Sequence, residues 1–581
     1  MVEDILRKGL LAAIETYGVY EEDIEISLEK PRERSHGDLS TNLALVLGGR
    51  LGRKPRELAG EIAARVGLPK DVIESVEIAG AGFINFRIAR THQVKLLLDV
   101  LRPEGALQDI KTGGNKRINV EFISANPTGP LNVVSARAGA FGMTLVRLLD
   151  AIGYDAHAEY YVNDAGRQVE LLGASLRANY LQLVGEPIPF PEGGYQGRYL
   201  EIMAAELQER DTAVIRKAAT AFDDESFQRV RAPEGNAEDW RQMPEEESIR
   251  CFAKYALMKI LSWQRETCRR FGLRFETWYF ESELHETKRV ERALEKLKKM
   301  GATYEEDGAV WFRSTAHDDE KDRVLVRADG VPTYFLADIA YHYHKFQRGF
   351  ESAIDYWGPD HHGYIARMQG AMEALGIGKD WLEVEILQHV TFLEGGRNIQ
   401  MSKRRGQFVT MDALIDEVGA DVAKYIFLTR KPNSHLDFDL DLAKDQSDQN
   451  PVMKVKYAHA RICTLLQKAL DEKGVTAGEP TAASLLHLEH EAEWNLVREL
   501  IRLPQIIVSA AQAREPHRLT GYVDEIASLY NQFYTQCKKI LEQEEQRRLA
   551  QLHLCVATRR VIKLVLDMLG VEAPEEMEKR D

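Results

Sequence analysis

The chain has 581 residues, of which 44% are hydrophobic and 29% are charged, and this length predicts about three to five domains. No apolar run reaches the ~20 residues that cross a bilayer, and the five cysteines form no C-x-x-C pair, so a membrane-spanning, disulfide-stapled or cysteine-zinc protein is excluded. The formal net charge of -15 does not exclude nucleic acid as a partner, because binding depends on where the basic residues lie.

Residues 1–110 predict a small α+β domain. The segment 1–18 has apolar residues at helical spacing interrupted by charges, which indicates a docking helix rather than a signal peptide and favours a cytoplasmic protein. A strand-like segment follows at 76–88. The stretch 102–117 is rich in glycine and charge and predicts a linker.

A strand–turn–helix pattern follows at 118–149. The strand ends near Glu121, and the turn Pro127-Thr128-Gly129-Pro130 precedes a helix that starts near Asn132. A helix N-terminus beside a glycine is suited to a phosphate, because its backbone N–H groups have no partner within the helix. The same pattern also occurs as a plain connection, so both interpretations stay open at this point.

The rest of the chain predicts two further units. Charged helical stretches over about 171–319 indicate an insertion, and strands and helices then alternate up to about residue 395. This alternation predicts a parallel, doubly wound sheet in a domain over 117–410. A connecting segment at 411–447 leads to 448–581, where apolar residues recur at helical spacing and predict an all-α bundle.

Two groups of residues outside the turn could bind a charged ligand group, one a phosphate and the other a guanidinium. Lys403 lies in a basic loop over 398–408 and could follow phosphate charge as it develops, although such a loop is also typical of a solvated turn. Tyr334 and Asp338 are one helical turn apart and, with Glu121, would form an anionic fork for a guanidinium. Alone, Asp338 is better explained as a charge that complements a helix N-terminus.

These features occur together with segments that resemble one family over essentially the whole chain. The matching segments are ERSHGDLSTNLAL, EFISANPTGP with ARAGAFG, TYFLADIAYHYHKF, YWGPDHHGY, MSKRRG, LDFDLDLAKDQSDQNPV, KYAHARICTLLQKA and DMLGVEAPEEM. They strongly resemble the bacterial-type arginyl-tRNA synthetases of class I. The resemblance implies a Rossmann-type catalytic domain with an insertion, an N-terminal domain that binds the tRNA elbow, and a helical anticodon-binding domain.

The resemblance also implies the reaction and its residues. ATP and L-arginine would form arginyl-adenylate, and the arginyl group would pass to tRNA(Arg), with Mg²⁺ accompanying ATP, no structural metal, and a monomeric enzyme. The positions implied for arginine binding are Glu121, Ser124, Asn126, Tyr334 and Asp338. Those implied for ATP are Asn126, Pro127, Thr128, Gly129, Asn132, Val134, Ser135, Gly358, Asp360, His361, Met401, Ser402 and Lys403, with Asn132, Ser135 and Lys403 as catalytic residues. Those implied for tRNA are Asn42, Tyr457 and Arg461.

The nucleotide element departs from the family pattern. Most class I synthetases have His-x-Gly-His where this chain has Asn132-Val133-Val134-Ser135, and Gln400 replaces the first lysine of the family's "KMSK" signature. Asn132 and Ser135 can still donate hydrogen bonds, whereas the valine at 134 stands where a glycine leaves room for adenine.

Three functions are compatible with these features to different degrees. An active synthetase of a divergent branch is favoured over a paralogue that has lost adenylation and only binds tRNA or regulates, because the arginine-pocket positions and Lys403 are all present. A nucleotidylyltransferase of the same superfamily fits poorly, since it would not need the long helical C-terminal half.

Overall fold

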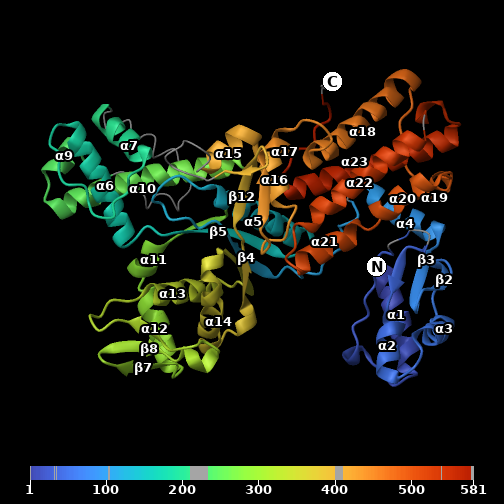
Figure 1. Ribbon diagram of the computed structural model, residues 1–581, viewed down its shortest axis with the longest axis horizontal. Coiled ribbons are helices and arrows are strands. Elements are labelled where there is room, and N and C mark those ends of the chain that lie inside the picture. The colour runs from blue at the N-terminus through green and yellow to red at the C-terminus, as the bar shows by residue number, and fades with distance from the viewer. Residues whose placement is uncertain are drawn as a thin grey trace.

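The computed structural model describes residues 2–31, 33, 36–102, 105–209, 233–399, 410–537 and 539–577. A central α/β domain lies between a group of helices from the insertion and a helical bundle near the C-terminus, and the N-terminal domain lies beside the bundle (Figure 1). The expected α/β class, with a parallel sheet, an N-terminal domain and a C-terminal helical domain, is confirmed.

The N-terminal domain packs three helices on an antiparallel sheet with the strand order β1-β3-β2. The strand-like segment of the sequence is a hairpin, because Gly80 and Gly82 adopt positive φ values between β2 and β3. The elements are α1 (Val2–Glu15), β1 (Leu39–Thr41), α2 (Leu43–Leu51), α3 (Pro55–Arg65), β2 (Ile73–Ala79), β3 (Phe83–Ile88) and then α4 (Arg90–Leu101), which packs on the bundle.

A five-stranded parallel sheet with the order β11-β10-β4-β5-β6 forms the centre of the molecule. Its strands are β4 (Arg117–Glu121), β5 (Asp155–Val162), β6 (Thr277–Phe280), β10 (Ser352–Trp357) and β11 (Leu382–Ile386). Ile118 and Val120 of β4 belong to the core that contains α5 (Val133–Ala151), whereas Glu121 points to α13 (Tyr334–Gln347) on the other face.

Strand β6 lies inside the range 171–319 that was expected to be a helical insertion, and it pairs with β5. The range therefore needs correction: helices precede β6, and a small sheet of order β7-β8-β9 follows it. Four residues are too few to show the alternation of a strand among charged helical stretches. The elements are α6 (Arg167–Leu183), α7 (Arg198–Glu209), α9 (Ala237–Gln242), α10 (Glu245–Arg270), α11 (Glu281–Glu286), α12 (Arg289–Lys299), β7 (Thr303–Glu306), β8 (Ala309–Phe312) and β9 (Arg323–Val326).

The segment between the central domain and the bundle completes a second small sheet of order β13-β12-β14. Helix α14 (Ile365–Ala374) follows β10. The later elements are β12 (Val390–Glu394), β13 (Arg397–Asn398), α15 (Met411–Val418), α16 (Ala420–Phe427), β14 (Leu436–Asp439) and α17 (Leu440–Lys444). Helix α16 packs against α5, so this segment is part of the same core.

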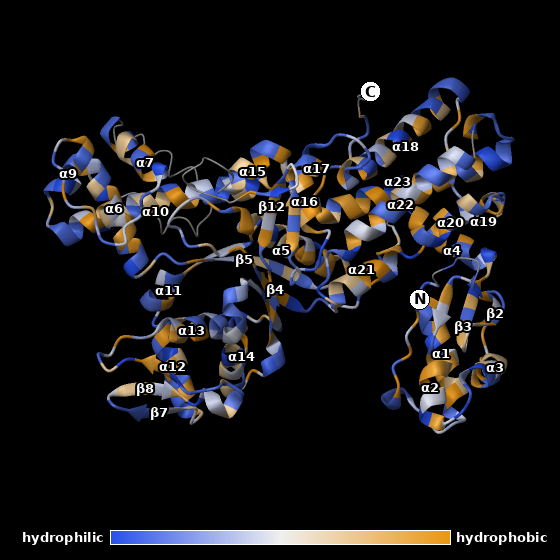
Figure 2. Cartoon of the chain, in the orientation of Figure 1, coloured by the Kyte–Doolittle hydropathy of each residue, from blue (hydrophilic) through white to orange (hydrophobic). Residues whose placement is uncertain are grey.

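The described residues of the C-terminal part, from 448 on, form helices joined by loops and no β-strand. Its helices show alternating hydrophilic and hydrophobic bands, as expected for amphipathic helices of a bundle (Figure 2). They are α18 (Pro451–Lys473), α19 (Ala482–Leu485), α20 (Glu491–Leu500), α21 (Leu503–Gln512), α22 (Arg518–Gln536) and α23 (Glu545–Leu569).

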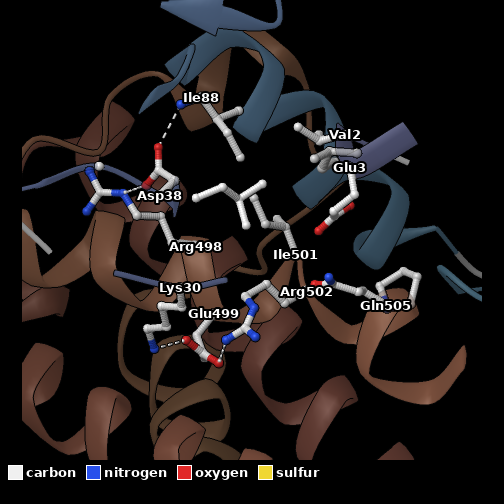
Figure 3. Close-up of a pocket in the computed structure, with 14 residues that line it drawn as sticks. Val2, Glu3, Lys30, Asp38, Ile88, Arg498, Glu499, Ile501, Arg502 and Gln505 are labelled. Carbon is white, nitrogen blue, oxygen red and sulfur yellow. Dashed lines mark hydrogen bonds and ion pairs between the residues drawn. The ribbon is translucent and has the colours of Figure 1, made fainter. Parts of the chain in front are cut away.

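Ion pairs join the N-terminal domain to this bundle around a pocket that both domains line (Figure 3). Glu499 of α20 pairs with Lys30 at 2.7 Å and with Arg502 at 2.7 Å. Asp38 accepts a hydrogen bond from the backbone of Ile88 at 2.7 Å and pairs with Arg498 at 2.9 Å. We call these contacts the domain junction.

Candidate active site

The candidate site lies where the chain reverses direction across the central sheet. From β4 the chain adds β5 and β6 on one side, and later β10 and β11 on the other. In doubly wound folds ligands bind outside the carboxyl ends of the strands at such a switch point. Glu121 and Asp355 are register partners at this end of the sheet. The turn before α5 and the segment after β10 both start from this edge.

The start of α5 is stabilised by Asn132. Its side-chain Oδ1 accepts hydrogen bonds from the backbone N of Ser135 at 3.0 Å and from the Ser135 hydroxyl at 3.3 Å. These are the contacts of a helix N-cap. Val133 is buried, whereas Val134 is 45% exposed, so the side chain that replaces the family glycine lies on the surface of the helix start.

The turn before α5 is held by the helices of the insertion. Tyr199 of α7 donates a hydrogen bond to the carbonyl of Thr128 at 2.6 Å. Gln264 of α10 donates to the carbonyls of Gly129, at 2.8 Å, and Asn126, at 3.3 Å. Pro127 is buried and the Asn126 side chain is exposed. The implied nucleotide turn is thus positioned by residues far away in the sequence.

The backbone directly after β4 is strained. Ile123 and Ser124 have φ values of 70° and 40°, which β-branched and other non-glycine residues rarely adopt. The turn brings the Ser124 hydroxyl to Glu121 Oε1, to which it donates at 2.8 Å, and the same hydroxyl accepts from the backbone N of Tyr161 at 3.0 Å. Strain of this kind clusters at functional sites.

Helix α13 presents four site residues on one face. Tyr334, Asp338, Tyr341 and Lys345 are spaced at i, i+4, i+7 and i+11, which align along one side of an α-helix. Tyr334 is 63% exposed at the first turn. Asp338 accepts a hydrogen bond from the Tyr364 hydroxyl at 2.6 Å, and burial raises the pKa of its carboxyl above the usual value.

Glu121 is bound from α13 by two buried side chains. Its Oε2 accepts hydrogen bonds from the Lys345 ammonium at 2.6 Å and from the Tyr341 hydroxyl at 2.9 Å. Only 9% of Glu121 is exposed, and Lys345 is fully buried. The charge of Glu121 also contributes to the raised pKa of Asp338, so the two carboxyls that the sequence paired are close enough to interact.

Behind Glu121 the charges are paired. Asp355 binds Lys345 at 2.9 Å and His342 at 2.8 Å, and although burial opposes it, these two partners lower the pKa of Asp355 to about 2. Glu121, His342 and Asp355 have the donor atoms of a cation site, and the Lys345 ammonium provides the cation for both carboxylates. Arg348 and Glu159 form a further pair at 2.6 Å.

Three of the remaining implied nucleotide positions, Gly358, Asp360 and His361, directly follow β10. Gly358 caps a short 3-10 helix over 359–364, in which Asp360 and His361 are exposed. Met401, Ser402 and Lys403 lie outside the described residues. The chain just after them is close to Asn132, because Thr410 forms an antiparallel bridge with Asn132 and the Met411 N–H binds the carbonyl of Leu131 at 2.8 Å.

The three implied tRNA positions lie in two other domains. Asn42 is exposed at the start of α2 in the N-terminal domain. Tyr457 and Arg461 are one turn apart on α18, and Arg461 binds Asn531 of α22 at 2.9 Å. The Arg461 guanidinium also lies over the ring of Tyr534 at 5.6 Å, and this tyrosine is 38% exposed. Such a pair of an arginine and an accessible ring suits a nucleobase.

Several site residues were missed by the sequence analysis. Tyr341 and Lys345 could have been found from their spacing to Asp338. Tyr199 and Gln264 give no such signal, because only the fold brings α7 and α10 to the turn. Glu281 is also buried beside Tyr161 and Asp338, and burial raises its pKa to about 7.

Comparisons with known proteins identify the family of the chain. The model of the class I tRNA synthetase (R) catalytic domain matches residues 97–437, so the fold and site define a class I aminoacyl-tRNA synthetase. The models of the arginyl-tRNA synthetase N-terminal domain and of the DALR anticodon-binding domain match residues 4–88 and 455–577.

Relatives cover the whole chain. An arginine–tRNA ligase of Heliobacterium modesticaldum is 42% identical over 557 residues, which is 95% of this chain and 94% of the relative. One from Bacillus licheniformis is 41% identical over 580 residues, or 99% of each chain. The solved arginyl-tRNA synthetase of Thermus thermophilus has the same fold, with a TM-score of 0.73 at 20% identity over 99% of this chain and 100% of that one. The chain belongs to the arginyl-tRNA synthetase family and is an arginine–tRNA ligase. The described helices include none with the length and hydrophobicity that a bilayer crossing requires.

Proposed function

We propose that the switch point of the central sheet is the active site and that Glu121, Tyr334 and Asp338 bind the guanidinium of L-arginine. The observation that carries this assignment is that Tyr341 and Lys345 of α13 bind Glu121 of β4, and that the same face of α13 carries Tyr334 and Asp338. Two carboxylates attract a planar cation through charge-assisted hydrogen bonds. Ser124 and Asn126, directly after β4, bind the α-amino and carboxylate groups.

The start of α5 and the segment after β10 bind ATP. Asn132 and Ser135, the turn Pro127–Gly129 and the surface at Val134 contact the nucleotide at the helix N-terminus. Gly358, Asp360 and His361 bind the ribose, and Met401, Ser402 and Lys403 bind the phosphates. Mg²⁺ enters with the ATP phosphates. Because Asn132 Oδ1 is used by the helix cap, its Nδ2 is the group that donates to a phosphate oxygen.

The enzyme is a cytoplasmic monomer that binds tRNA(Arg) across its two outer domains. Asn42 contacts the tRNA elbow, and Tyr457 and Arg461 contact the anticodon loop. The exposed ring of Tyr534 beside Arg461 supports a surface where a single-stranded base stacks. Sedimentation of the free protein and of its tRNA complex measures the proposed stoichiometry of one chain to one tRNA.

The catalytic proposal is tested by ATP–pyrophosphate exchange and by charging of tRNA(Arg). We expect exchange that requires arginine and tRNA(Arg), followed by multiple turnovers of charging. Tight tRNA binding without exchange or charging would instead identify a tRNA-binding paralogue. Exchange with ATP and a non-amino-acid substrate would identify a nucleotidylyltransferase.

Variants at Asn132 separate catalysis from helix capping. Asn132→Asp keeps the capping oxygen and removes the amide donor, so we expect kcat to fall on the order of 10²-fold with little change in Tm. Asn132→Ala removes both groups and should also lower stability by about 1 kcal/mol. If Asn132→Asp retains the full kcat, Asn132 is only a helix cap.

A further inference from the structure

The two carboxyls of the proposed amino-acid site have different partners. Glu121 has a cation of its own, because the Lys345 ammonium lies 2.6 Å from its Oε2. Asp338 forms no ion pair with another described residue, and the side-chain hydrogen bond it receives comes from the neutral hydroxyl of Tyr364. In the free enzyme the two carboxyl groups therefore have different electrostatic surroundings.

Lys345 cannot reach a bound substrate itself. Its side chain is fully buried, with the ammonium held between Glu121 and Asp355 and lying 4.6 Å from the centre of the Tyr341 ring. A buried lysine is costly unless its charge is compensated, and here two carboxylates compensate it. Any effect of Lys345 on catalysis must therefore pass through the groups that it binds.

We infer that Lys345 is the positioning residue of the arginine pocket: it orients the Glu121 carboxylate and supplies its counter-charge, whereas Asp338 takes its counter-charge from the bound amino acid. The inference rests on the proposed function, because it takes Glu121 and Asp338 as the groups that bind the guanidinium. It makes the pocket specific for a substrate with one positive charge, since one of the two acids is already neutralised by the protein.

The surroundings of Glu121 explain why the ammonium is needed. The titratable and polar groups that face it are Ser124 from the following loop, Asp338, Tyr341, His342 and Lys345 from α13, Asp355 from β10, and Tyr161 and Glu159 from β5. Three of these groups are acids. Without Lys345, Glu121 would be buried among acids with no cation beside it, and its carboxylate would no longer be held in place for a guanidinium.

The test compares Lys345→Met with the wild type in steady-state arginylation at neutral pH. We expect the KM for arginine to rise about tenfold or more, with the KM for ATP within about twofold. In a Glu121→Gln background, Lys345→Met should add less than about twofold, because both changes remove the same interaction.

The matched control is Arg348→Met. Arg348 is also on the C-terminal side of α13 and pairs with the buried Glu159 at 2.6 Å, behind the pocket. It should lower Tm, as any broken buried pair does, while the KM for arginine stays close to that of the wild type. Equal effects of the two variants on the KM for arginine would overturn the inference.

Two further outcomes are decisive. Lys345→Gln retains hydrogen-bond donors to Glu121 and Asp355 but loses the charge, so it replaces Lys345→Met if the latter does not fold, and a rise in the KM for arginine is again expected. An unchanged KM for arginine in both variants would overturn the role of Lys345. If Glu121→Gln alone leaves the KM for arginine unchanged, the proposed arginine pocket fails, and the positioning role of Lys345 fails with it.

Discussion

The domain junction and the proposed arginine pocket both hold acids, but they differ in the ion pairs that these acids form. At the junction Asp38 has Arg498, and Glu499 has both Lys30 and Arg502. In the proposed pocket Asp338 forms no ion pair with a described residue, and its side chain accepts a hydrogen bond from the Tyr364 hydroxyl. A surface that holds two domains together gains from complete pairs, whereas a binding site must leave a charge for its ligand.

The pKa shifts of Asp38 and Asp338 do not reflect this difference in ion pairing. Burial raises the pKa of Asp38 as well as that of Asp338, so burial alone does not separate structural from functional acids. The distinction lies in the partner: Asp38 is bound by a guanidinium of this chain, and Asp338 by a phenol. Perturbed acids mark functional sites only when the geometry is also considered.

The largest effect that tests this comparison is expected for Asp338→Asn. Removal of the charge that awaits the substrate guanidinium should raise the KM for arginine by about a hundredfold or more. Tm should stay equal or rise, because an uncompensated buried carboxylate destabilises the free enzyme at neutral pH. Kinetics and thermal unfolding of the same preparation measure both effects. A normal KM together with a lower Tm would show that Asp338 is structural, like Asp38.

The pH dependence of arginine binding gives a second test of the role of Asp338. The pKa of Asp338 is raised in the free enzyme, and the bound guanidinium lowers it, so binding is strongest above the free-enzyme pKa and weakens as the pH falls through it. We expect the Kd for arginine to rise up to about tenfold per pH unit below that pKa. Calorimetric titration at several pH values measures it.

Two variants identify the residue whose titration causes this pH dependence. Asp338→Asn should remove it, whereas Glu281→Gln should only shift it, because Glu281 has a pKa of about 7 and interacts with Asp338 by charge alone. A slope that persists in Asp338→Asn would place the titrating group elsewhere.

The smallest effect is expected at the domain junction. Arg498→Met leaves the buried Asp38 without its cation and should lower the free energy of unfolding by about 2 kcal/mol, with the KM for arginine unchanged. Glu491→Gln removes the exposed partner of the same arginine and should cost less than about 0.5 kcal/mol. Thermal unfolding distinguishes the two. A change in arginine KM in either variant would mean that the junction is coupled to the pocket.

The sequence by itself determined the fold class, the family and the residues nearest to the site. Tyr334 and Asp338 share one side of α13 because their spacing is that of a helical turn, and this was readable without a structure. The strand–turn–helix at 118–149 was equally readable, since its signals are local.

Only the tertiary structure decided which charges are already paired. Lys345 meets Glu121 across 224 positions of sequence, and Tyr199 meets Thr128 across 71, and no local pattern records either contact. The place of β6 in the central sheet and the exposure of Val134 likewise depend on packing between distant segments. The spacing of residues in the sequence determines which face of a helix or strand each side chain occupies. Which other elements pack against that face depends on how the whole chain folds.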